Sequence, residues 1–391
     1  MLVAGEASGD LLAAELAAAL RGRLPDADYF GAGGARMATE GVALVQEMSR
    51  LSVVGITDVL AKLFELRRLM KQLLAAAVAR QPDVIIGVDY GGFNLRFGHA
   101  VKEYVRNNPF SQWNPKIVQF VSPQVWASRP GRAQRLAEDY DLLLSIFPFE
   151  KDWYAQRVPN LRVEFVGHPM VGRFTNDHLR GFTNDDLQIT RPEPGGPLTA
   201  NRAPQILLLP GSRKSELKRH LPPMLGALEL MRAQLPIGAK MVLPDPALAE
   251  LAGRLMTPSV NLEIQTGNLS QALAQADLAI SKTGTVTMEC AFFGVPAVTL
   301  YQGSWLNYQI ARHLITVKTF TMPNLLANEE VYPEFLQNEL TAENLARAAL
   351  ELLQNEERRK TIKSQLARII ASLGEPGAPQ RAADAILSLL E

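Results

Sequence analysis

The sequence has little cysteine and no excess of either charge. It contains one cysteine, Cys290, in 391 residues, so no disulfide can form within the chain and a reducing compartment is expected. Lysine and arginine together number 40, as do aspartate and glutamate. Without a surplus of basic charge, nucleic acid is not an expected partner. The hydrophobic share of 47% and the charged share of 20% are typical of a well-packed globular protein.

Long hydrophobic runs and metal-binding motifs are also missing. No stretch of about 18 or more apolar residues occurs, so no helix is expected to span a bilayer. The first residues, Met1 to Glu6, carry no basic segment before a long apolar one, and no secretion signal is expected. The five histidines are scattered without metal-ligand spacing. The segment Gly31–Arg36 lacks the last glycine of a dinucleotide fingerprint. We therefore expect neither a metal nor a cofactor.

Apolar segments that alternate with helical patterns predict an α/β fold with both faces of each sheet covered. The chain is longer than one core usually organises, so two domains are expected. We predict a first domain at 1–173, a polar insertion or linker at 174–204, a second domain at 205–345 and C-terminal helices at 346–391. Strands are expected at 83–88, 116–121, 142–147, 205–209, 239–243, 278–280 and 297–300.

A turn rich in hydroxyl groups follows one of these strands and runs directly into a helix, from Ile280 to Ala291. Backbone N–H groups and the helix dipole at such a turn attract an anion such as a phosphate. Glu289 lies about one turn into the helix, where its carboxylate could accept two ribose hydroxyls. A simple helix N-cap explains the Ser and Thr residues equally well.

A second strand, glycine turn and helix occurs at Leu207–Glu216. Arg213 in this turn can pair with a diphosphate through two hydrogen bonds. A departing diphosphate gains charge in the transition state, so a fixed cation there would favour the reaction. The alternative is an ordinary surface arginine after a turn.

The first half offers candidates for binding and proton transfer. Ser8 and Asp10, after the glycine turn at the first strand, either cap a helix or bind an acceptor. Asp89 ends an apolar strand beside glycines, where burial would raise its pKa and suit a general base; a turn aspartate bonded to its own backbone is the alternative. His168 ranks lower, because a lone histidine before a proline is more often a structural hydrogen-bonding residue.

A helical pattern at 51–71 combines a wide apolar face with four cations, Lys62, Arg67, Arg68 and Lys71. Such a helix can lie in a membrane interface or hold an acyl chain. Burial against the domain core is the alternative, and periodicity alone favours it. The apolar face is formed by Val59, Leu60, Leu63, Phe64, Leu66 and Leu69.

In their order along the chain, these motifs resemble those of the lipid-A-disaccharide synthase family. The matching pieces are Gly5–Asp10, Val59–Leu60, Gly87–Asp89 with Phe93–Asn94, Val121–Ala127, Phe147–Glu150, Gly167–His168, Leu209–Arg213 with Glu216, Gly284–Glu289 and Pro323–Ala327.

The resemblance implies a GT-B fold, in which two Rossmann-like domains face a cleft and C-terminal helices cross back to the first domain. It implies inverting, metal-independent transfer of 2,3-diacylglucosamine from its UDP donor to 2,3-diacylglucosamine 1-phosphate, which gives the β-1,6 disaccharide and UDP. Residues matching Asp89 and Arg213 are essential in the family, and the helix matching Val59–Leu69 contacts membrane and acyl chains there. Peripheral association with the inner face of the cytoplasmic membrane, as a monomer or homodimer, is therefore expected.

The resemblance also implies a set of site residues. Catalysis is assigned to Asp89 and Arg213, with His168 as a further candidate. The UDP-sugar would be bound by Gly211, Ser212, Arg213, Lys282, Thr283, Gly284, Thr285, Thr287, Glu289 and Asn324. The acceptor would be bound by Glu6, Ser8, Gly9, Asp10 and Asn94. Membrane or acyl contact would come from Val59, Leu60, Leu63, Phe64 and Leu66.

The chain departs from the family pattern at three places. Ser128 stands where a second tryptophan is usual, Lys282 where a small residue is usual, and Tyr90-Gly91-Gly92 after Asp89 lacks an acid found in many members. The segments 107–114 and 174–204 have no counterpart that can be placed. Another UDP-sugar enzyme of the same fold, a lipid glycosyltransferase or an epimerase, and a non-catalytic relative are the competing hypotheses.

Overall fold

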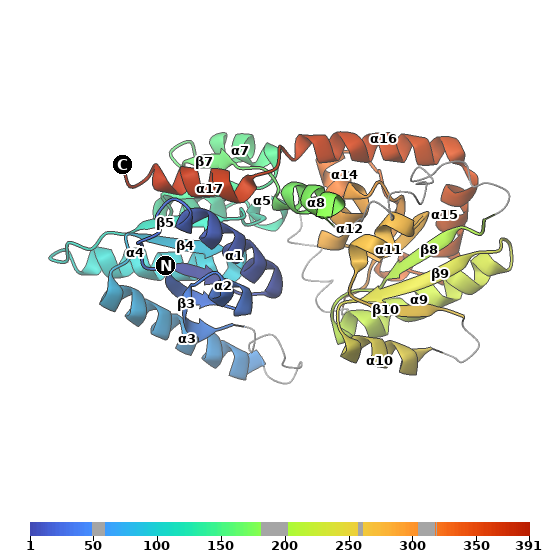
Figure 1. Ribbon diagram of the computed structural model, residues 1–391, viewed down its shortest axis with the longest axis horizontal. Coiled ribbons are helices and arrows are strands. Elements are labelled where there is room, and N and C mark those ends of the chain that lie inside the picture. The colour runs from blue at the N-terminus through green and yellow to red at the C-terminus, as the bar shows by residue number, and fades with distance from the viewer. Residues whose placement is uncertain (49–58, 181–201, 257–260, 304–316, 318) are drawn as a thin grey trace. The chain divides into compact units, whose positions relative to one another are not determined.

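The computed structural model describes residues 1–48, 59–180, 202–256, 261–303, 317 and 319–391, without the side chains of 59–63 and 175–180. The chain forms two compact units, 1–179 with 373–391, and 180–372 (Figure 1). Each unit has its own parallel sheet, so the α/β class expected from the sequence is confirmed.

The first unit contains a seven-stranded sheet in the order β3-β2-β1-β4-β5-β6-β7, and neighbouring strands are parallel throughout. The central strands are buried over nearly their whole length, which explains their continuous apolar sequences. The strands are β1 (Leu2–Ala4), β2 (Phe30–Gly33), β3 (Ala43–Glu47), β4 (Val84–Val88), β5 (Lys116–Phe120), β6 (Leu142–Ser145) and β7 (Val163–Phe165).

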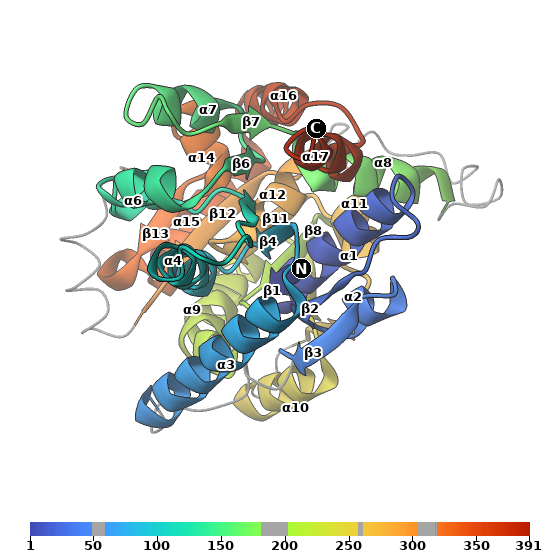
Figure 2. The ribbon, with the colours of Figure 1, turned by 90° about the vertical axis from the view of Figure 1, so that its left-hand side faces the viewer.

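Helices cover both faces of this sheet. In Figure 2, α3, α4 and α6 lie on one side of the strands and α1 and α17 on the other. The core on the α3 side joins Leu73, Phe97 and Leu136 to strand residues such as Ile85 and Ile117. The helices of the unit are α1 (Ala7–Arg21), α2 (Ala35–Thr39), α3 (Val59–Arg80), α4 (Gly91–Asn107), α5 (Val125–Ser128), α6 (Arg132–Asp139), α7 (Pro148–Ala155), α8 (Pro169–Arg180) and α17 (Ala378–Leu387).

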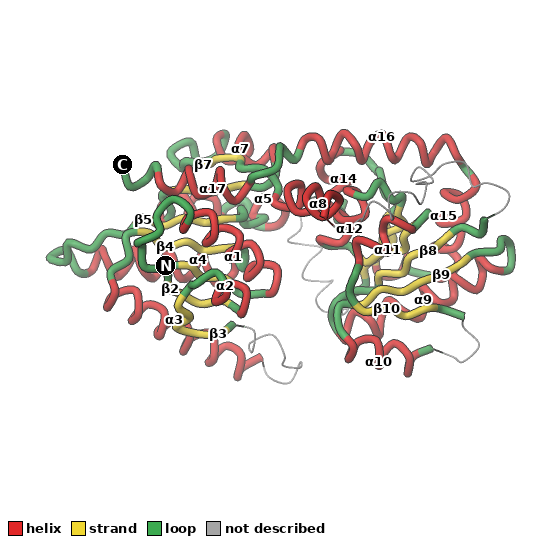
Figure 3. The backbone as a smooth tube through the Cα atoms, in the orientation of Figure 1, coloured by secondary structure: helices red, strands yellow, loops and turns green. Residues whose placement is uncertain are grey.

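The second unit contains a six-stranded sheet in the order β10-β9-β8-β11-β12-β13, again with parallel neighbours. Figure 3 shows its strands in yellow between helices in red. The strands are β8 (Gln205–Leu209), β9 (Gly238–Leu243), β10 (Glu263–Thr266), β11 (Leu278–Lys282), β12 (Ala297–Tyr301) and β13 (Glu334–Leu336). The helices are α9 (Lys214–Arg232), α10 (Pro246–Leu255), α11 (Leu269–Gln275), α12 (Thr285–Phe292), α14 (Met322–Ala327), η4 (Gln337–Glu339), α15 (Ala342–Gln354) and α16 (Glu356–Ser372).

The C-terminal helices divide between the two units. Helix α15 packs against α9, and α16 against α12 and α14, within the second unit. Helix α17 packs against α1 in the first unit, where Arg23 forms an ion pair with Asp384. A glycine-rich break at 374–377 separates α16 from α17, and both Gly374 and Gly377 have a positive φ that favours glycine.

Every strand expected from the sequence is present, with ends shifted by one or two residues. Five further strands, β2, β3, β7, β10 and β13, were not predicted. They are short, and β3, β10 and β13 are only partly buried, so none has a long apolar run. Strand β2 lies within a glycine-rich segment in which only Phe30 carries a large side chain. The start of the expected amphipathic helix, 51–58, lies outside the described residues.

Gly31 is required for the pairing of β2 with β1. An added Cβ would lie 1.7 Å from the carbonyl oxygen of Leu2, which is backbone and cannot move without separating the strands. We expect Gly31→Ala to lower the free energy of unfolding by more than about 3 kcal/mol, or to give insoluble protein. The control is Gly131→Ala, since nothing lies within 4 Å of a Cβ there. Urea unfolding of both variants measures the difference; equal stabilities would contradict the close approach.

Candidate functional site

Both sheets reverse their strand order at one place, and the candidate residues gather there. In the first sheet β1 lies beside β4, with Ala4 opposite Val88. In the second sheet β8 lies beside β11, with Leu209 opposite Ser281. The connections on the two sides of such a point leave in opposite directions, so a crevice opens at the carboxyl ends of the strands. Asp89 follows β4 directly, and the turn that contains Arg213 follows β8.

Asp89 lies in a setting that favours its protonated form. Burial raises the pKa of Asp89, and the nearby charge of Glu6 raises it further, while the Tyr90 N–H and the Ser8 hydroxyl oppose this shift. The Ser8 Oγ donates to Asp89 Oδ2 across 3.4 Å. Ser8 and Glu6, expected near an acceptor, therefore lie beside the expected base. A carboxylate with a raised pKa is a better proton acceptor than an ordinary solvated aspartate.

The backbone around Asp89 is held in an unfavourable conformation. Asp89 has φ 50° and Tyr90 has φ 44°, a left-handed region that costs free energy for residues with a Cβ. Two buried amides stabilise the turn: Asn94 Nδ2 and Gln119 Nε2 each donate to the Asp89 carbonyl oxygen across 2.9 Å. Asn94, expected to bind an acceptor, thus holds the Asp89 turn through a hydrogen bond from the protein interior. Gln119 was not predicted, because a glutamine inside an apolar strand carries no motif.

The remaining residues expected at the acceptor site have structural contacts. Asp10 accepts hydrogen bonds from the backbone N–H groups of Gly34, Arg36 and Met37 at 2.7, 3.1 and 3.2 Å. It therefore caps the start of α2. Gly9 lies next to the Asp89 turn, and an added Cβ there would be in ordinary contact with the Asp89 Cβ at 3.6 Å.

In the second unit, a cavity of about 270 Å³ lies at the carboxyl ends of β8, β9 and β11 and at the start of α12. We call it the second-unit cavity. It brings together the two turns that the sequence predicted to bind phosphate, although they are about 70 residues apart. Among its lining residues are Gly211, Ser212, Lys282, Gly284, Thr285 and Glu289.

A buried carboxylate joins the two turns. Glu216, which is 7% exposed, accepts the Ser212 N–H at 3.0 Å and pairs with Lys282 at 3.3 Å and with Arg213 at 3.8 Å. Gly211 has φ 128°, and an added Cβ would lie 2.5 Å from Glu216 Oε2. The unusual Lys282 therefore has a structural partner, and Glu216 sets the position of both cations.

The start of α12 presents backbone donors to the second-unit cavity. Gly284 has φ 145° and accepts the Thr287 hydroxyl at 2.7 Å. Thr287 is fully buried, and Thr283 is 9% exposed, with its N–H bonded to Leu300. These two threonines form the turn, whereas the backbone of 284–286 lines the cavity. An anion there would meet unpaired helix N–H groups.

Both polar atoms of the Asn324 side chain form hydrogen bonds inside the protein. Its Nδ2 donates to the Tyr332 carbonyl and to Glu334 at 2.8 Å each, and its Oδ1 accepts the N–H groups of Val331 and Tyr332 at 2.9 and 2.8 Å. It is 0% exposed. The sequence predicted that this amide would contact UDP, but the geometry gives it the role of joining α14 to β13.

His168 and His220 each hold a loop. His168 accepts the Met170 N–H at 3.2 Å, and burial lowers its pKa to about 4, with the charge of Arg173 adding to the shift. It is therefore neutral at pH 7. His220 was not predicted as a site residue: its Nδ1 lies 2.7 Å from the Pro210 carbonyl and its Nε2 3.1 Å from the Gln302 N–H. This pattern fixes the tautomer and ties the Arg213 turn to the end of β12.

Helix α3 is buried at its C-terminal part and more exposed toward its start. Leu69 and Leu73 belong to the core, and Leu66 packs partly against it, whereas Phe64 is 68% exposed. The side chains of Val59, Leu60 and Leu63 lie outside the described residues. None of the helices in the described part of the chain has the length and hydrophobicity to cross a membrane. In the same part of the chain, no three His, Cys, Asp or Glu side chains are grouped as metal ligands.

The chain is similar to proteins of one family over almost its whole length. The family model described as lipid-A-disaccharide synthetase matches residues 1–387. The lipid-A-disaccharide synthase of Myxococcus xanthus is 35% identical over 393 residues, covering 100% of this chain and 97% of that protein.

Solved structures of similar fold have low sequence identity. The UDP-GlcNAc 2-epimerase of Neisseria meningitidis, bound to UDP-GlcNAc, has a TM-score of 0.59 and 11% identity, covering 100% of this chain and 98% of that one. MurG of Acinetobacter baumannii has a TM-score of 0.55 and 17% identity, with 99% and 98% covered. At such low identities, these two structures show a similar fold and nothing more.

Glu150 makes the stability of the first unit depend on pH. It is fully buried and accepts the Trp126 indole N–H at 2.9 Å; burial raises its pKa to about 7, although the hydrogen bonds from Trp126, Ser122 and the backbone oppose this. A raised carboxyl pKa stabilises the fold below the unfolded value and loses that contribution as pH rises through 7. Relative to Glu150→Gln, the wild type should therefore lose roughly 3 kcal/mol of unfolding free energy between pH 4.5 and 7.5.

Urea unfolding at several pH values, followed by fluorescence, measures this difference. The control is Glu103→Gln, which removes an exposed carboxylate from α4 and should give a difference that is flat with pH. A flat difference for Glu150→Gln as well would show that Glu150 stays ionised in the folded protein.

Proposed function

The chain belongs to the lipid-A-disaccharide synthase family, and on that premise we propose how its residues carry out the reaction. The protein is a glycosyltransferase of the GT-B fold that forms the lipid A disaccharide from a sugar-nucleotide donor and a lipid acceptor. We propose 2,3-diacylglucosamine linked to UDP as the donor and 2,3-diacylglucosamine 1-phosphate as the acceptor. Residues 1–173 would bind the lipid acceptor, 205–345 the donor, with 174–204 as a linker and the helices of 346–391 joining the two.

The donor is assigned to the second-unit cavity, and one observation carries this assignment. Two turns distant in sequence line one cavity on the carboxyl edge of the sheet, one through Gly211 and Ser212 and the other through Lys282, Gly284 and Thr285. The diphosphate would accept hydrogen bonds from the N–H groups at the start of α12 and pair with Arg213 and Lys282. Glu289 would accept hydroxyls of the ribose. The UDP-GlcNAc bound in the Neisseria epimerase is a ligand of this chemical class.

Arg213 and Lys282 would stabilise the leaving group. When the bond between the anomeric carbon and the diphosphate breaks, UDP leaves with the electron pair and its charge increases. Cations fixed beforehand by Glu216 stabilise that charge without further reorganisation. Thr283, Thr287, Glu216, His220 and Asn324 act as positioning residues, because their polar atoms hold the turns.

Asp89 is the general base of the proposed reaction. As the 6-hydroxyl oxygen of the acceptor bonds to the anomeric carbon, its proton passes to the Asp89 carboxylate. Attack from the face opposite to the departing UDP inverts the configuration. Because the raised pKa of Asp89 leaves the base protonated at low pH, kcat/KM should rise with pH through that pKa. His168 is a positioning residue in this scheme, since its ring is buried and neutral.

The reaction itself is the first test. Purified protein, mixed with the UDP donor and the 1-phosphate acceptor in neutral detergent micelles, should give the disaccharide by mass spectrometry and release one UDP per product. A well-folded protein that forms no disaccharide would refute the proposed function.

The roles of Asp89 and Arg213 are tested by substitution. We expect Asp89→Asn to lower kcat about 10²- to 10⁴-fold and Arg213→Ala about 10²- to 10³-fold, with unchanged melting temperatures. The matched control is Asp83→Asn, because Asp83 is exposed at the opposite end of β4. Activity of Asp89→Asn within threefold of Asp83→Asn would exclude Asp89 as the base and support a non-catalytic or different mechanism.

An epimerase is the second candidate, because the fold is shared with UDP-GlcNAc 2-epimerases. An epimerase converts its UDP-sugar without an acceptor, whereas a transferase does not. Incubation of the protein with the UDP donor alone, followed by NMR of the sugar, separates the two. The 35% identity to a lipid-A-disaccharide synthase favours the transferase, which should leave the donor sugar unchanged.

The start of α3 is proposed to contact the inner face of the cytoplasmic membrane, with the protein as a monomer or homodimer. Phe64 is 68% exposed, and cations lie beside the apolar face of the helix. Replacing Leu60, Leu63 and Phe64 together by Ser should reduce sedimentation with anionic vesicles at least fivefold. The control is Phe110→Ser, since Phe110 is 99% exposed on the loop between α4 and β5 and is not part of α3. If sedimentation is unchanged, the helix does not contact the membrane.

A further inference from the structure

The first unit contains a different cavity, which is lined by arginines. It measures about 140 Å³ and lies between α4 and α6, with Arg96 and His99 from α4 and Arg132, Arg135 and Asp139 from α6 among its lining residues. We call it the arginine pocket. Arg132 and Arg135 are three residues apart, so they lie on one face of α6. The volume is several-fold the ~30 Å³ that one water occupies in the liquid, which leaves room for a tetrahedral anion.

The positive charges of the arginine pocket are not balanced by ion pairs. Among the described residues, no carboxylate forms an ion pair with Arg96, Arg132, Arg135 or the neighbouring Arg129. The pKa of Arg132 is lowered, first by burial and then by the charges of Arg129, Arg96 and Arg135. The charges of Arg129, Arg96 and Arg135 therefore act unfavourably on the Arg132 guanidinium, and an anion bound among these exposed side chains would relieve that repulsion.

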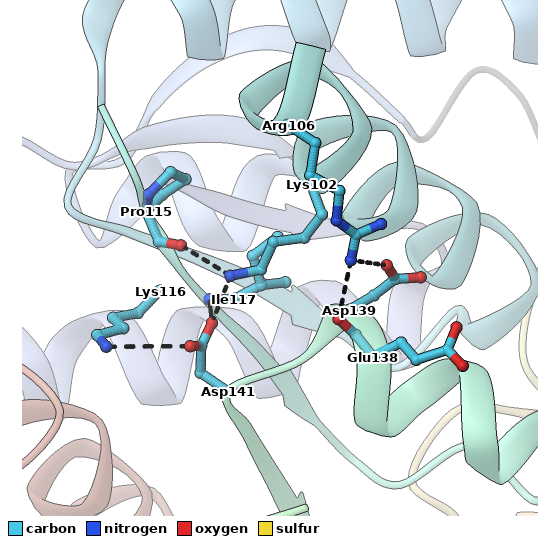
Figure 4. A network of polar contacts seen from close by, with 8 residues as sticks. All are labelled: Lys102, Arg106, Pro115, Lys116, Ile117, Glu138, Asp139 and Asp141. Atoms are coloured by element: carbon cyan, nitrogen blue, oxygen red, sulfur yellow. Dashed lines mark hydrogen bonds and ion pairs between the residues drawn. The ribbon is translucent and has the colours of Figure 1, made fainter. Parts of the chain in front are cut away.

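The acidic residues next to the arginine pocket are already paired or turned to solvent. Asp139 is 1% exposed; its carboxylate bonds to His99 Nδ1 at 2.9 Å and to Arg106 at 3.5 Å. Figure 4 shows Arg106 reaching the Asp139 carboxylate and the Glu138 carbonyl, while Lys102 and Lys116 contact Asp141 instead. The Glu138 side chain is exposed. The Asp139 carboxylate, which is part of the pocket lining, is thus already paired with His99 and Arg106.

An apolar groove continues directly from the arginine pocket. This groove, about 530 Å³ in volume, runs between α3 and the start of α4, and it shares Gly92 and Arg96 with the pocket. Its other lining residues include Leu66, Met70 and Phe93. Tyr90 also lines it and directly follows Asp89. The expected base Asp89, the groove residues Tyr90 and Phe93, and the pocket residue Arg96 therefore follow one another in sequence at the start of α4.

We propose that Arg96, Arg132 and Arg135 bind the phosphate monoester of the lipid acceptor, and that the α3–α4 groove holds the apolar part of the same molecule. This inference rests on the proposed function and gives the acceptor a specific recognition site. Guanidinium groups bind a phosphate monoester through paired, charge-assisted hydrogen bonds. The dianionic phosphate would fix which end of the sugar points away from Asp89 and would select acceptor over uncharged glycolipid.

The test compares a triple variant with a control of equal charge. Arg96→Gln, Arg132→Gln and Arg135→Gln are combined, and the control combines Arg36→Gln, Arg80→Gln and Arg157→Gln, which lie elsewhere on the first unit. In neutral detergent micelles, we expect the triple variant to raise KM for the phosphate-bearing acceptor 10- to 100-fold. Its kcat and its KM for the UDP donor should stay within twofold of wild type. The control should match wild type. A variant with lysine at the three positions keeps the charge but not the paired hydrogen bonds, so its KM should lie between those of wild type and the triple variant.

A dephosphorylated acceptor provides the specific readout. Wild type should use it with the high KM of the triple variant, and the triple substitution should then change KM by less than twofold. A KM that rises equally for both acceptors would overturn the proposal and indicate a structural effect. Loss of sedimentation with phosphatidylglycerol vesicles, with an unchanged KM in micelles, would assign the arginines to the bilayer surface and overturn it as well.

Direct binding separates this proposal from the proposed function. Equilibrium binding of the phosphorylated and dephosphorylated lipids in micelles needs no turnover. Wild type could form no disaccharide and still bind the phosphorylated lipid at least tenfold more tightly than the dephosphorylated one, with the triple variant losing that preference. This result would support the phosphate site at the arginine pocket and refute the proposed function. If the protein forms the disaccharide but binds both lipids equally, the proposed phosphate site is refuted and the proposed function is not.

Discussion

The pairing of β1 with β4, and of β8 with β11, is the constraint on which the candidate site depends. In each sheet this pair lies where the strand order reverses, so the loops on either side move apart and leave the strand ends accessible. The register of the pairing then decides which residues meet. The pairing of Leu209 with Ser281 brings the Arg213 turn and the Lys282 turn to one cavity, although the two turns are far apart in the sequence.

Buried polar side chains convert this topology into fixed geometry. Each strand end leaves backbone groups that a tight turn cannot satisfy by itself. Gln119 and Asn94 bind the carbonyl of Asp89, while Glu216 and His220 hold the Arg213 turn. Such groups are costly to bury without partners, and their hydrogen bonds offset the strain of the left-handed backbone at Asp89. The side chains of Asp89 and Arg213 stay partly exposed, because the hydrogen bonds that hold the two turns come from side chains in the protein interior.

The sequence predicted the α/β class, the longer strands and the two strand–turn–helix segments for which we propose phosphate binding, because apolar runs and glycine turns are local signals. It did not predict β2, in which Gly31 is required by an approach to Leu2 that is visible only in the pairing. It also assigned ligand contacts to Asp10 and Asn324, whose polar atoms satisfy backbone groups distant in sequence. A residue type suited to binding is equally suited to such internal contacts, and only the tertiary structure separates the two.

The division into two sheets has an electrostatic consequence. A base that accepts a proton from a hydroxyl needs a raised pKa, whereas a departing diphosphate needs cations. Arg213 and Lys282 placed beside Asp89 on one sheet edge would lower the pKa of Asp89 and weaken the proposed base. In the first unit, partial burial and the charge of Glu6 instead raise the pKa of Asp89, and the second unit carries both cations on Glu216. In the first unit, the unpaired arginines lie on α4 and α6, where an acceptor phosphate would neutralise them on binding.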